Sequence, residues 1–123
     1  ALIPSFIFKM NQVLMSITPK DFSFIAEENL SDIFKRLASE SARINVMQNS
    51  ALSFTACMDI RPESLPKIVE NLSADYIIKY NNDLELVTIR HYDQATIDRV
   101  TTGKQIFMEQ KTRQTVRIVM KNS

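Results

Sequence analysis

The hydrophobic period changes once within residues 27–48, EENLSDIFKRLASESARINVMQ. From residue 27 to residue 42, apolar side chains recur every three or four positions, which predicts an amphipathic helix. Its apolar stripe consists of Leu30, Ile33, Phe34, Leu37 and Ala38. From residue 44 to residue 48 the side chains alternate instead, which predicts a β-strand. This region therefore predicts a helix followed directly by a strand.

The flanking segments extend this order on both sides. Alternating side chains predict strands at 13–18, 52–58 and 75–80, and the helical period returns at 65–72. Residues 13–80 thus read strand, helix, strand, strand, helix, strand. This is the order of the split βαβ unit, so we expect an α+β, ferredoxin-like fold. Such a unit has a four-stranded antiparallel sheet with both helices on one face.

The last third of the chain begins the same order without finishing it. It predicts a strand at 84–90, a helix at 94–101 and a hairpin of strands at 105–110 and 114–120. A second unit would then lack its last helix and its last strand. The opening segment 3–10 alternates like a strand and is available to fill the vacant strand position.

We therefore expect two units, one nested within the other. Residues 13–80 form the complete first unit, inserted between strand 3–10 and residues 84–120, which form the incomplete second unit. Two short polar stretches, Asn11-Gln12 and Asn81-Asn82-Asp83, are expected to separate neighbouring strands. No low-complexity linker divides the units.

The composition excludes several classes of protein. The chain has 123 residues, a formal net charge of +1 and 45% hydrophobic residues, as in an ordinary globular domain. One cysteine, Cys57, excludes an internal disulfide, and no apolar run is long enough to span a bilayer. The near-zero charge argues against non-specific nucleic-acid binding. We expect a cytoplasmic protein without membrane or nucleic-acid partners.

Glycine is nearly absent from the sequence. The chain has one glycine, Gly103, whereas phosphate-binding loops and nucleophile elbows need several. Gly103 is instead expected to end the helix at 94–101, with Asp93 as its N-cap. The lone His91 has no neighbouring ligands, so no metal site is expected. We therefore expect no catalytic residues in this chain.

Three stretches carry a resemblance to a known family. They are Asn11–Ile17 (NQVLMSI), Leu30–Leu37 and Arg43–Ser50 (RINVMQNS). Together with the order of elements, they are similar to the regulatory region of aspartate kinases, which is built from paired ACT domains. Ile3-Pro4-Ser5-Phe6 also looks like the junction that follows the catalytic domain of these enzymes. The resemblance implies that 13–80 is one ACT domain and that 3–10 with 84–120 is a second.

The resemblance implies a regulatory role. Aspartate kinases phosphorylate the side-chain carboxylate of aspartate with ATP and magnesium, and their kinase domain precedes the ACT region. Those cofactors would belong to that domain, and none is expected here. In the family, a pathway end-product binds between ACT units, often across a dimer interface, and inhibits the enzyme. The implied partners are lysine as first choice of effector, threonine as second, a second copy of the chain and the kinase domain.

The resemblance also implies effector-binding residues in three places. The start of the first helix would supply Ala26, Asn29 and Leu30, the following strand Ile44 and Asn45, and the turn after it Gln48, Asn49 and Ser50. Free N–H groups at a helix start suit a carboxylate, and amide or hydroxyl groups suit an ammonium group.

Asn45 departs from the lysine-sensitive members, which often have aspartate there. The acidic loop with Asp21, Glu27 and Glu28 can meet a cationic side chain instead.

Alternatives stay open at this point. Asn and Ser at 45–50 are also ordinary turn formers, and Asn29 or Ser31 can simply cap a helix. The region can be a structural dimerisation module that senses nothing, or the ACT region of another enzyme of amino-acid metabolism. RNA-binding modules share the topology, but their aromatic and glycine-rich signature is missing. The basic residues Lys111, Arg113, Arg117 and Lys121 are expected on one solvated face of the last hairpin.

Overall fold

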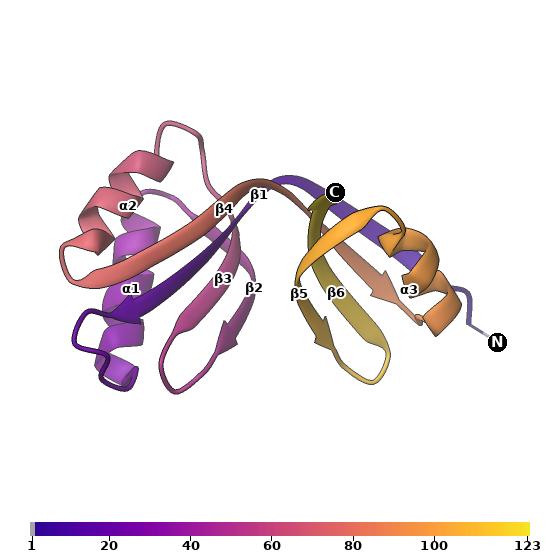
Figure 1. Cartoon of the computed structure of the whole chain (residues 1–123), viewed down its shortest axis with the longest axis horizontal. Helices are drawn as coiled ribbons and strands as arrows, with labels where there is room; N and C mark the ends of the chain where they lie inside the picture. Colours follow the sequence, from indigo (N-terminus) through magenta and orange to yellow (C-terminus); the bar gives the residue numbers. More distant parts are fainter. Residues whose placement is uncertain (1) are drawn as a thin grey trace. The chain divides into compact units, whose positions relative to one another are not determined.

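The computed structural model describes residues 2–123 and contains six strands and three helices (Figure 1). The elements in chain order are β1 (Ser5–Pro19), α1 (Glu27–Ser39), β2 (Arg43–Asn49), β3 (Phe54–Asp59), α2 (Leu65–Ser73), β4 (Tyr76–Arg90), α3 (Gln94–Thr101), β5 (Lys104–Lys111) and β6 (Thr115–Asn122). The strands form one antiparallel sheet in the order β2-β3-β1-β4-β6-β5.

The chain divides into two compact units. The inner unit is Val13–Asn82, and the outer unit comprises the residues up to Gln12 together with Asp83–Ser123. The long strands β1 and β4 each contribute one half to either unit, so the sheet order is β2-β3-β1-β4 in the inner unit and β1-β4-β6-β5 in the outer unit.

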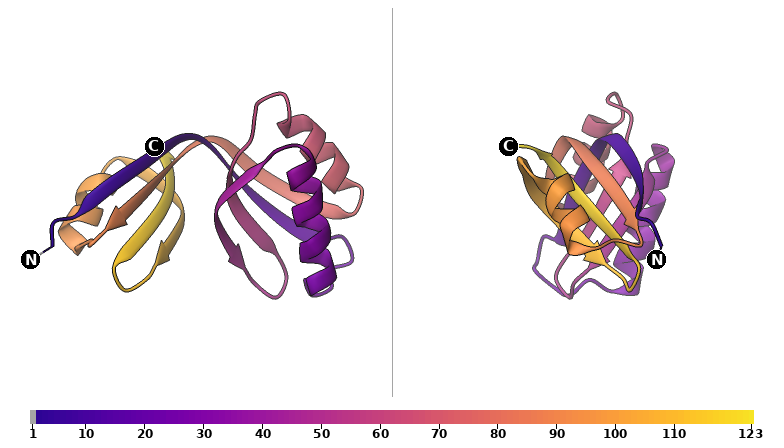
Figure 2. Two further views of the ribbon diagram at one scale, coloured as in Figure 1. Left: turned by 180° about the vertical axis from the view of Figure 1, so that it is seen from behind. Right: turned by 90° about the vertical axis from the view of Figure 1, so that its right-hand side faces the viewer.

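The inner unit has the expected ferredoxin-like order, with α1 and α2 on the same face of its strands (Figure 2). Its core joins alternate strand residues to the apolar stripes of both helices. The fully buried members are Met15, Ile17, Ile33, Leu37, Phe54, Ala56, Met58, Ile68 and Leu72. Phe34 of α1 meets Phe54 of β3 edge to face, with ring centroids 5.4 Å apart. The amphipathic periods read from the sequence are confirmed here, and Pro66 lies in the first turn of α2.

The outer unit has four strands and, among the described residues, one helix. Its core is formed by α3 residues and the facing side chains of β4 and β6. Val87 pairs with Ile118, and Ile89 pairs with Val116, in the antiparallel β4–β6 register. The Asp93 side chain accepts the N–H of Thr96 at 2.7 Å, which confirms the expected N-cap of α3.

The opening segment is a strand that lies next to β4, as expected. The expected breaks at Asn11-Gln12 and Asn81-Asn82-Asp83 are wrong, however, because β1 and β4 run through them without ending. Asn11 and Asp83 each have a φ of 56°, a left-handed conformation that Asn and Asp tolerate better than other side chains. A single such residue changes the direction of a strand without stopping it. The expected pair of sheets is therefore one sheet.

Several other boundaries differ by one to three residues, and two of these differences have a clear local cause. Helix α1 ends at Ser39 rather than Ala42, because Ser41 has a φ of 59° and the chain leaves the helical path there. Strand β3 begins at Phe54 rather than at residue 52, since Ser50 and Ser53 close a turn through Ser50 N–H to Ser53 O, at 2.9 Å. Over residues 2–123, every helix is too short or too polar to cross a membrane.

Candidate functional site

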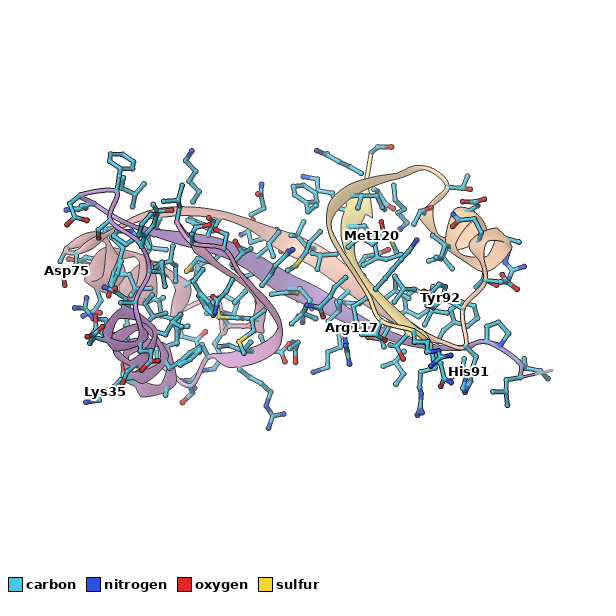
Figure 3. All side chains as sticks on the ribbon, turned by 90° about the horizontal axis from the view of Figure 1, so that it is seen from below. Lys35, Asp75, His91, Tyr92, Arg117 and Met120 are labelled. Atoms are coloured by element: carbon cyan, nitrogen blue, oxygen red, sulfur yellow. The ribbon has the colours of Figure 1, made fainter. Side chains whose placement is uncertain are left out.

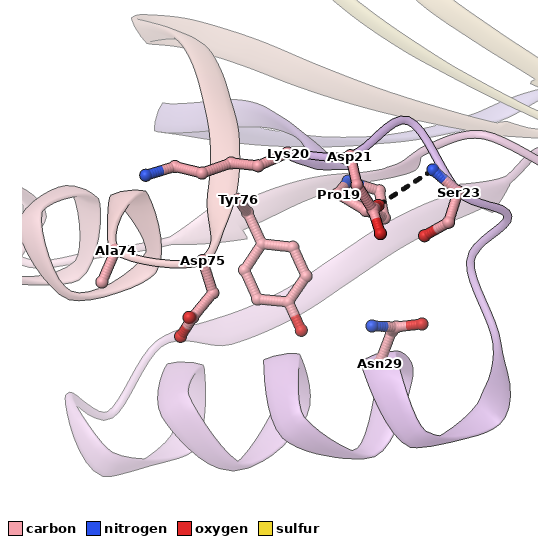
Figure 4. Close-up of a pocket in the computed structure, with 8 residues that line it drawn as sticks. All are labelled: Pro19, Lys20, Asp21, Ser23, Asn29, Ala74, Asp75 and Tyr76. Atoms are coloured by element: carbon pink, nitrogen blue, oxygen red, sulfur yellow. Dashed lines mark hydrogen bonds between the residues drawn. The ribbon is translucent and has the colours of Figure 1, made fainter.

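A cavity of about 370 Å³ opens at one end of the inner unit (Figure 4). It lies between the loop after β1, the first turn of α1 and the connection from α2 to β4. Its lining residues are Pro19, Lys20, Asp21, Ser23, Asn29, Ala74, Asp75 and Tyr76. The volume is in the range of small-ligand sites, and the side chains that line it are mostly polar.

Tyr76 forms a fixed wall of this cavity. The residue is 4% exposed, and its hydroxyl donates to a carboxylate oxygen of Asp32 at 2.9 Å. Burial, more than any other cause, raises the pKa of Tyr76, so the phenol stays neutral at physiological pH.

Asp75 is held at the rim by Arg36. The guanidinium of Arg36 donates to Asp75, to Asp32 at 3.1 Å and to the backbone carbonyl of Asn71 at 3.1 Å. It also lies over the ring of Tyr76, 5.8 Å from the centroid. The pKa of Arg36 is raised, chiefly by the hydrogen bond to Asp75. Arg36 of α1 thus fixes the end of α2 and the Asp75 side chain, which lies at the surface of the inner unit (Figure 3).

Asp21 supplies a second carboxylate, on the loop side. Its Oδ1 accepts the backbone N–H of Ser23 at 3.0 Å. Hydrogen bonds from the side chain and backbone of Ser23 lower the pKa of Asp21, so it is ionised at neutral pH. The charged groups in and directly behind the lining are Asp21, Asp32, Asp75, Lys20 and Arg36. Three carboxylates against two cations leave one net negative charge.

The predicted residues at the start of α1 lie beside this cavity. Asn29 lines it. Its Oδ1 also accepts the backbone N–H of Ala26 at 2.9 Å, so Asn29 helps to cap the helix, which was one of the alternative roles for this residue. Ala26 is the N-cap residue and is exposed, whereas Leu30 turns inward and packs against the core.

The predicted turn residues lie at the same end of the inner unit as the start of α1. Gln48 and Asn49 end β2 and are exposed, and the hydroxyl of Ser50 accepts the N–H of Ser53 at 3.1 Å. The N–H of Ile25 donates to the carbonyl of Ala51 at 2.8 Å, which holds the loop before α1 against this turn.

Ile44 and Asn45 lie at the opposite end of β2. Asn45 precedes Ser50 by five residues of extended chain, a separation of about 16 Å. Ile44 packs against the core, and Asn45 sits at an irregularity in the β2–β3 register between Ile44 and Val46. Its Nδ2 donates to the Oδ2 of Asp59 at 3.2 Å. The eight predicted residues therefore fall into two groups within one unit.

This architecture is similar to that of several solved structures. A structure assigned as a C-terminal regulatory domain of aspartate kinase from Porphyromonas gingivalis aligns with 95% of the chain, with 85% of its own length covered, a TM-score of 0.76 and 15% identity. Escherichia coli aspartokinase III in complex with lysine and aspartate aligns with 94% of the chain (28% of its own length, TM-score 0.70, 16% identity). The regulatory subunit of aspartate kinase from Thermus flavus aligns with 94% (86% of its own length, TM-score 0.64, 10% identity).

The chain has the fold of aspartate kinase regulatory domains. It spans most of the length of isolated regulatory domains but 28% of the E. coli aspartokinase. No protein-family model and no curated protein sequence matches it.

Sequence reasoning missed the far wall of the cavity in this aspartate kinase regulatory fold. Asp75 and Tyr76 lie more than 45 residues after Asn29 in the sequence and reach it because β1 and β4 are neighbours in the sheet. Since these neighbours are antiparallel, the end of β1 and the start of β4 lie at the same edge. The pairing of β1 with β4 was therefore the feature from which this wall of the cavity could have been predicted. Asp59, the partner of Asn45, was missed because its position depends on the hairpin register, in which it faces Arg43.

The remaining candidates have structural roles. Cys57 is fully buried in β3, as expected of a small apolar residue. His91 has a φ of 57°, and its backbone N–H donates to Gln114 O at 2.6 Å. Across residues 2–123, no three His, Cys, Asp or Glu side chains gather in a way that would hold a metal ion.

Proposed function

We propose that the chain is the allosteric regulatory region of a cytoplasmic aspartate kinase, and that a pathway end-product amino acid binds it and inhibits the kinase. Lysine is the first choice of effector and threonine the second. The observation that carries the proposal is the alignment of 94–95% of the chain with aspartate kinase regulatory domains. The structure of E. coli aspartokinase III that aligns with it was determined with lysine and aspartate bound.

The proposed mechanism is a difference in affinity. An effector inhibits only if it binds the inactive arrangement of the enzyme more tightly than the active one. The kinase domain, with its ATP and magnesium, would lie in the remainder of a longer protein, and a second copy of the chain would complete a dimer through the ACT domains. The candidate contacts are the eight residues at the start of α1 and along β2, to which Asp59 adds a carboxylate beside Asn45.

The test is a thermal-shift screen of the chain against the twenty amino acids, followed by calorimetry with lysine and threonine. A ligand that binds only the folded state must raise Tm. We expect one of the two amino acids to bind saturably, and Asn45→Ala to weaken its binding. Asn71→Ala, on the exposed face of α2, is the matched control and should leave the affinity unchanged. A folded dimer that binds no amino acid would contradict the proposal.

A structural dimerisation module is the second candidate, and one observation favours it. The amide of Asn45 already donates to Asp59, which gives this side chain a role in holding the irregular β2–β3 hairpin. In that case Asn45→Ala would lower Tm, and no amino acid would shift the Tm of the chain. The same screen therefore separates the two candidates.

A further inference from the structure

The sheet of the inner unit has a second cavity, of about 280 Å³, on the face opposite α1 and α2. It is lined by Ser16, Thr18, Phe22, Ile77 and Lys79, and none of the eight predicted effector-binding residues is among them. We propose that this cavity binds a small monocarboxylate with an apolar body. The inference goes beyond the proposed function and does not depend on the identity of the effector.

The alternation of side chains along two strands forms the floor of this cavity. In β1 the odd-numbered residues 13–17 belong to the core beneath the helices, and in β4 Tyr76 and Ile78 pack in the same core. Successive side chains of a strand point to opposite faces of the sheet. The lining residues of both strands therefore lie on the face that the two helices do not cover.

The direction of the strands gives the cavity an apolar end and a polar end. Because β1 and β4 are antiparallel neighbours, the end of β1 and the start of β4 lie at the same edge. Thr18 and Ile77 are nearest to this edge, where the loop with Phe22 follows β1. Ser16 and Lys79 each lie two residues, about 7 Å, farther along their strands. A ligand can therefore contact apolar side chains at one end and charged or polar ones at the other.

The polar end offers hydrogen-bond donors and one positive charge. Lys79 is exposed, and within residues 2–123 no carboxylate forms an ion pair with it. The hydroxyl of Ser16 is likewise without a hydrogen-bond partner in the described part of the chain. An ammonium group has three donors and a hydroxyl adds one, which suits the two oxygens of a carboxylate. A single cation matches a charge of −1 better than the double charge of a phosphate group.

Phe22 lines the apolar end in an unusual backbone conformation. Its φ is 58°, in a left-handed region that aromatic residues seldom adopt, and its N–H donates to Pro19 O at 3.0 Å. The side chain is 70% exposed, so packing in the core does not explain its position. Strained residues of this kind cluster at ligand-binding sites. The ring of Phe22 and the side chain of Ile77 would contact the apolar body of the ligand.

The size of the cavity defines the probe. Its volume is that of about nine molecules of liquid water, so it holds a ligand of about as many non-hydrogen atoms. Benzoate is of this size and combines one negative charge with a flat apolar ring. Benzamide has nearly the same shape without the charge. Comparison of the two therefore isolates the contribution of the carboxylate.

The experiment is an amide chemical-shift titration of the whole chain with benzoate and with benzamide at constant ionic strength. Benzoate should shift the amides of residues 16–22 and 77–79 saturably. It should bind about three- to tenfold more tightly than benzamide, a modest factor because the cation is exposed. Lys79→Gln should remove this difference. Lys67→Gln, on the exposed face of α2, makes the same change of charge and should leave the difference unchanged.

The apolar end is tested with a second pair of variants. Phe22→Asn removes the ring but keeps a residue that tolerates a positive φ, and it should weaken the binding of both probes by about threefold or more. Phe24→Asn is the matched control, because Phe24 is 72% exposed and does not line the cavity. It should leave both affinities unchanged.

Three results would overturn the inference. They are the absence of saturable shifts at these amides in a folded chain, equal binding of benzoate and benzamide, and a Lys79→Gln variant that binds benzoate as tightly as the original chain. Lysine and threonine are titrated separately, against Asn45→Ala. Failure of this inference therefore leaves the proposed function standing, and failure of the proposed function leaves this inference standing.

Discussion

The inner and outer units share one strand order but differ in how many helices cover it. The inner unit has α1 and α2 over its four strands, while the described part of the outer unit has only α3. The consequence is visible on β4 in the inner unit and on β1 in the outer unit, which occupy equivalent end positions in the two strand orders. Tyr76 of β4 is 4% exposed beneath the helices, whereas Phe6 and Phe8 of β1 are 38% and 53% exposed and stack on each other, with centroids 6.3 Å apart. In the inner unit this strand therefore buries its aromatic side chain in the core that two helices complete, whereas in the outer unit the aromatic side chains stay exposed.

The largest expected effect compares two phenylalanines. Phe54→Ala removes a fully buried ring of the inner core and should lower the free energy of unfolding by about 3–5 kcal/mol. Phe8→Ala removes a half-exposed ring and should change it by less than about 0.5 kcal/mol. Urea denaturation followed by circular dichroism measures both. A large loss for Phe8→Ala would mean that this surface is covered in solution.

The next effect compares Arg36 and Arg99, the basic residues in the last turns of α1 and α3. Arg36 joins α1 to the end of α2, so Arg36→Ala should destabilise the chain by about 1–3 kcal/mol, because Asp32 and Asp75 lose their shared partner. Arg99 is exposed in the last turn of α3, and the described part of the outer unit has no second helix, so Arg99→Ala should cost little. Equal losses in urea denaturation for the two variants would contradict this difference.

The helix ends give a smaller, reciprocal comparison. Helix α3 is followed by Gly103 at a φ of 72°, and α1 is followed by Ser41 at a φ of 59°. Gly103→Ala should cost about 1 kcal/mol through backbone strain alone, since a Cβ there meets nothing within 4 Å. Ser41→Gly should be neutral or stabilising for the same reason. Thermal unfolding of the two variants checks both signs, and opposite signs to these would refute the backbone argument.

The smallest effect is a dependence on pH in the outer unit. Hydrogen bonds from Thr96 lower the pKa of Asp93 in the folded state. The stability that this carboxylate adds is therefore complete above its unfolded pKa of about 3.9 and is lost as the pH falls through the lower folded value. Asp93→Asn keeps a good N-cap without the charge, so the difference in Tm between the two proteins should shrink below about pH 4. A difference that grows in acid would be the wrong sign.

The hydrophobic periods predicted most of this fold, but they did not predict that β1 and β4 are continuous strands. The stripe from Leu30 to Ala38 and the alternation after Ile44 identified α1 and β2, because each face packs against the core. Asn11 and Asp83 look like strand ends in a sequence, yet each is a single left-handed residue inside a strand. A polar residue that tolerates this conformation has the same appearance in a turn and in a bend of a strand.

Local sequence patterns predicted only one side of the cavity. Asp21 lies in the loop directly before α1, and Asn29 lies in the first turn of that helix. Their proximity could therefore be predicted from where the helix starts. Asp75 and Tyr76 join them through the pairing of β1 with β4, which no local pattern encodes. The hairpin register that brings Asp59 to Asn45 is likewise a long-range property.

Hydrogen exchange of the chain with and without saturating L-lysine tests the central claim, that the inner unit is the sensing half. We predict slower exchange for amides at residues 20–29 of the inner unit and no change in α3 of the outer unit. Exchange that is unchanged everywhere, or slowed only in the outer unit, would contradict the account.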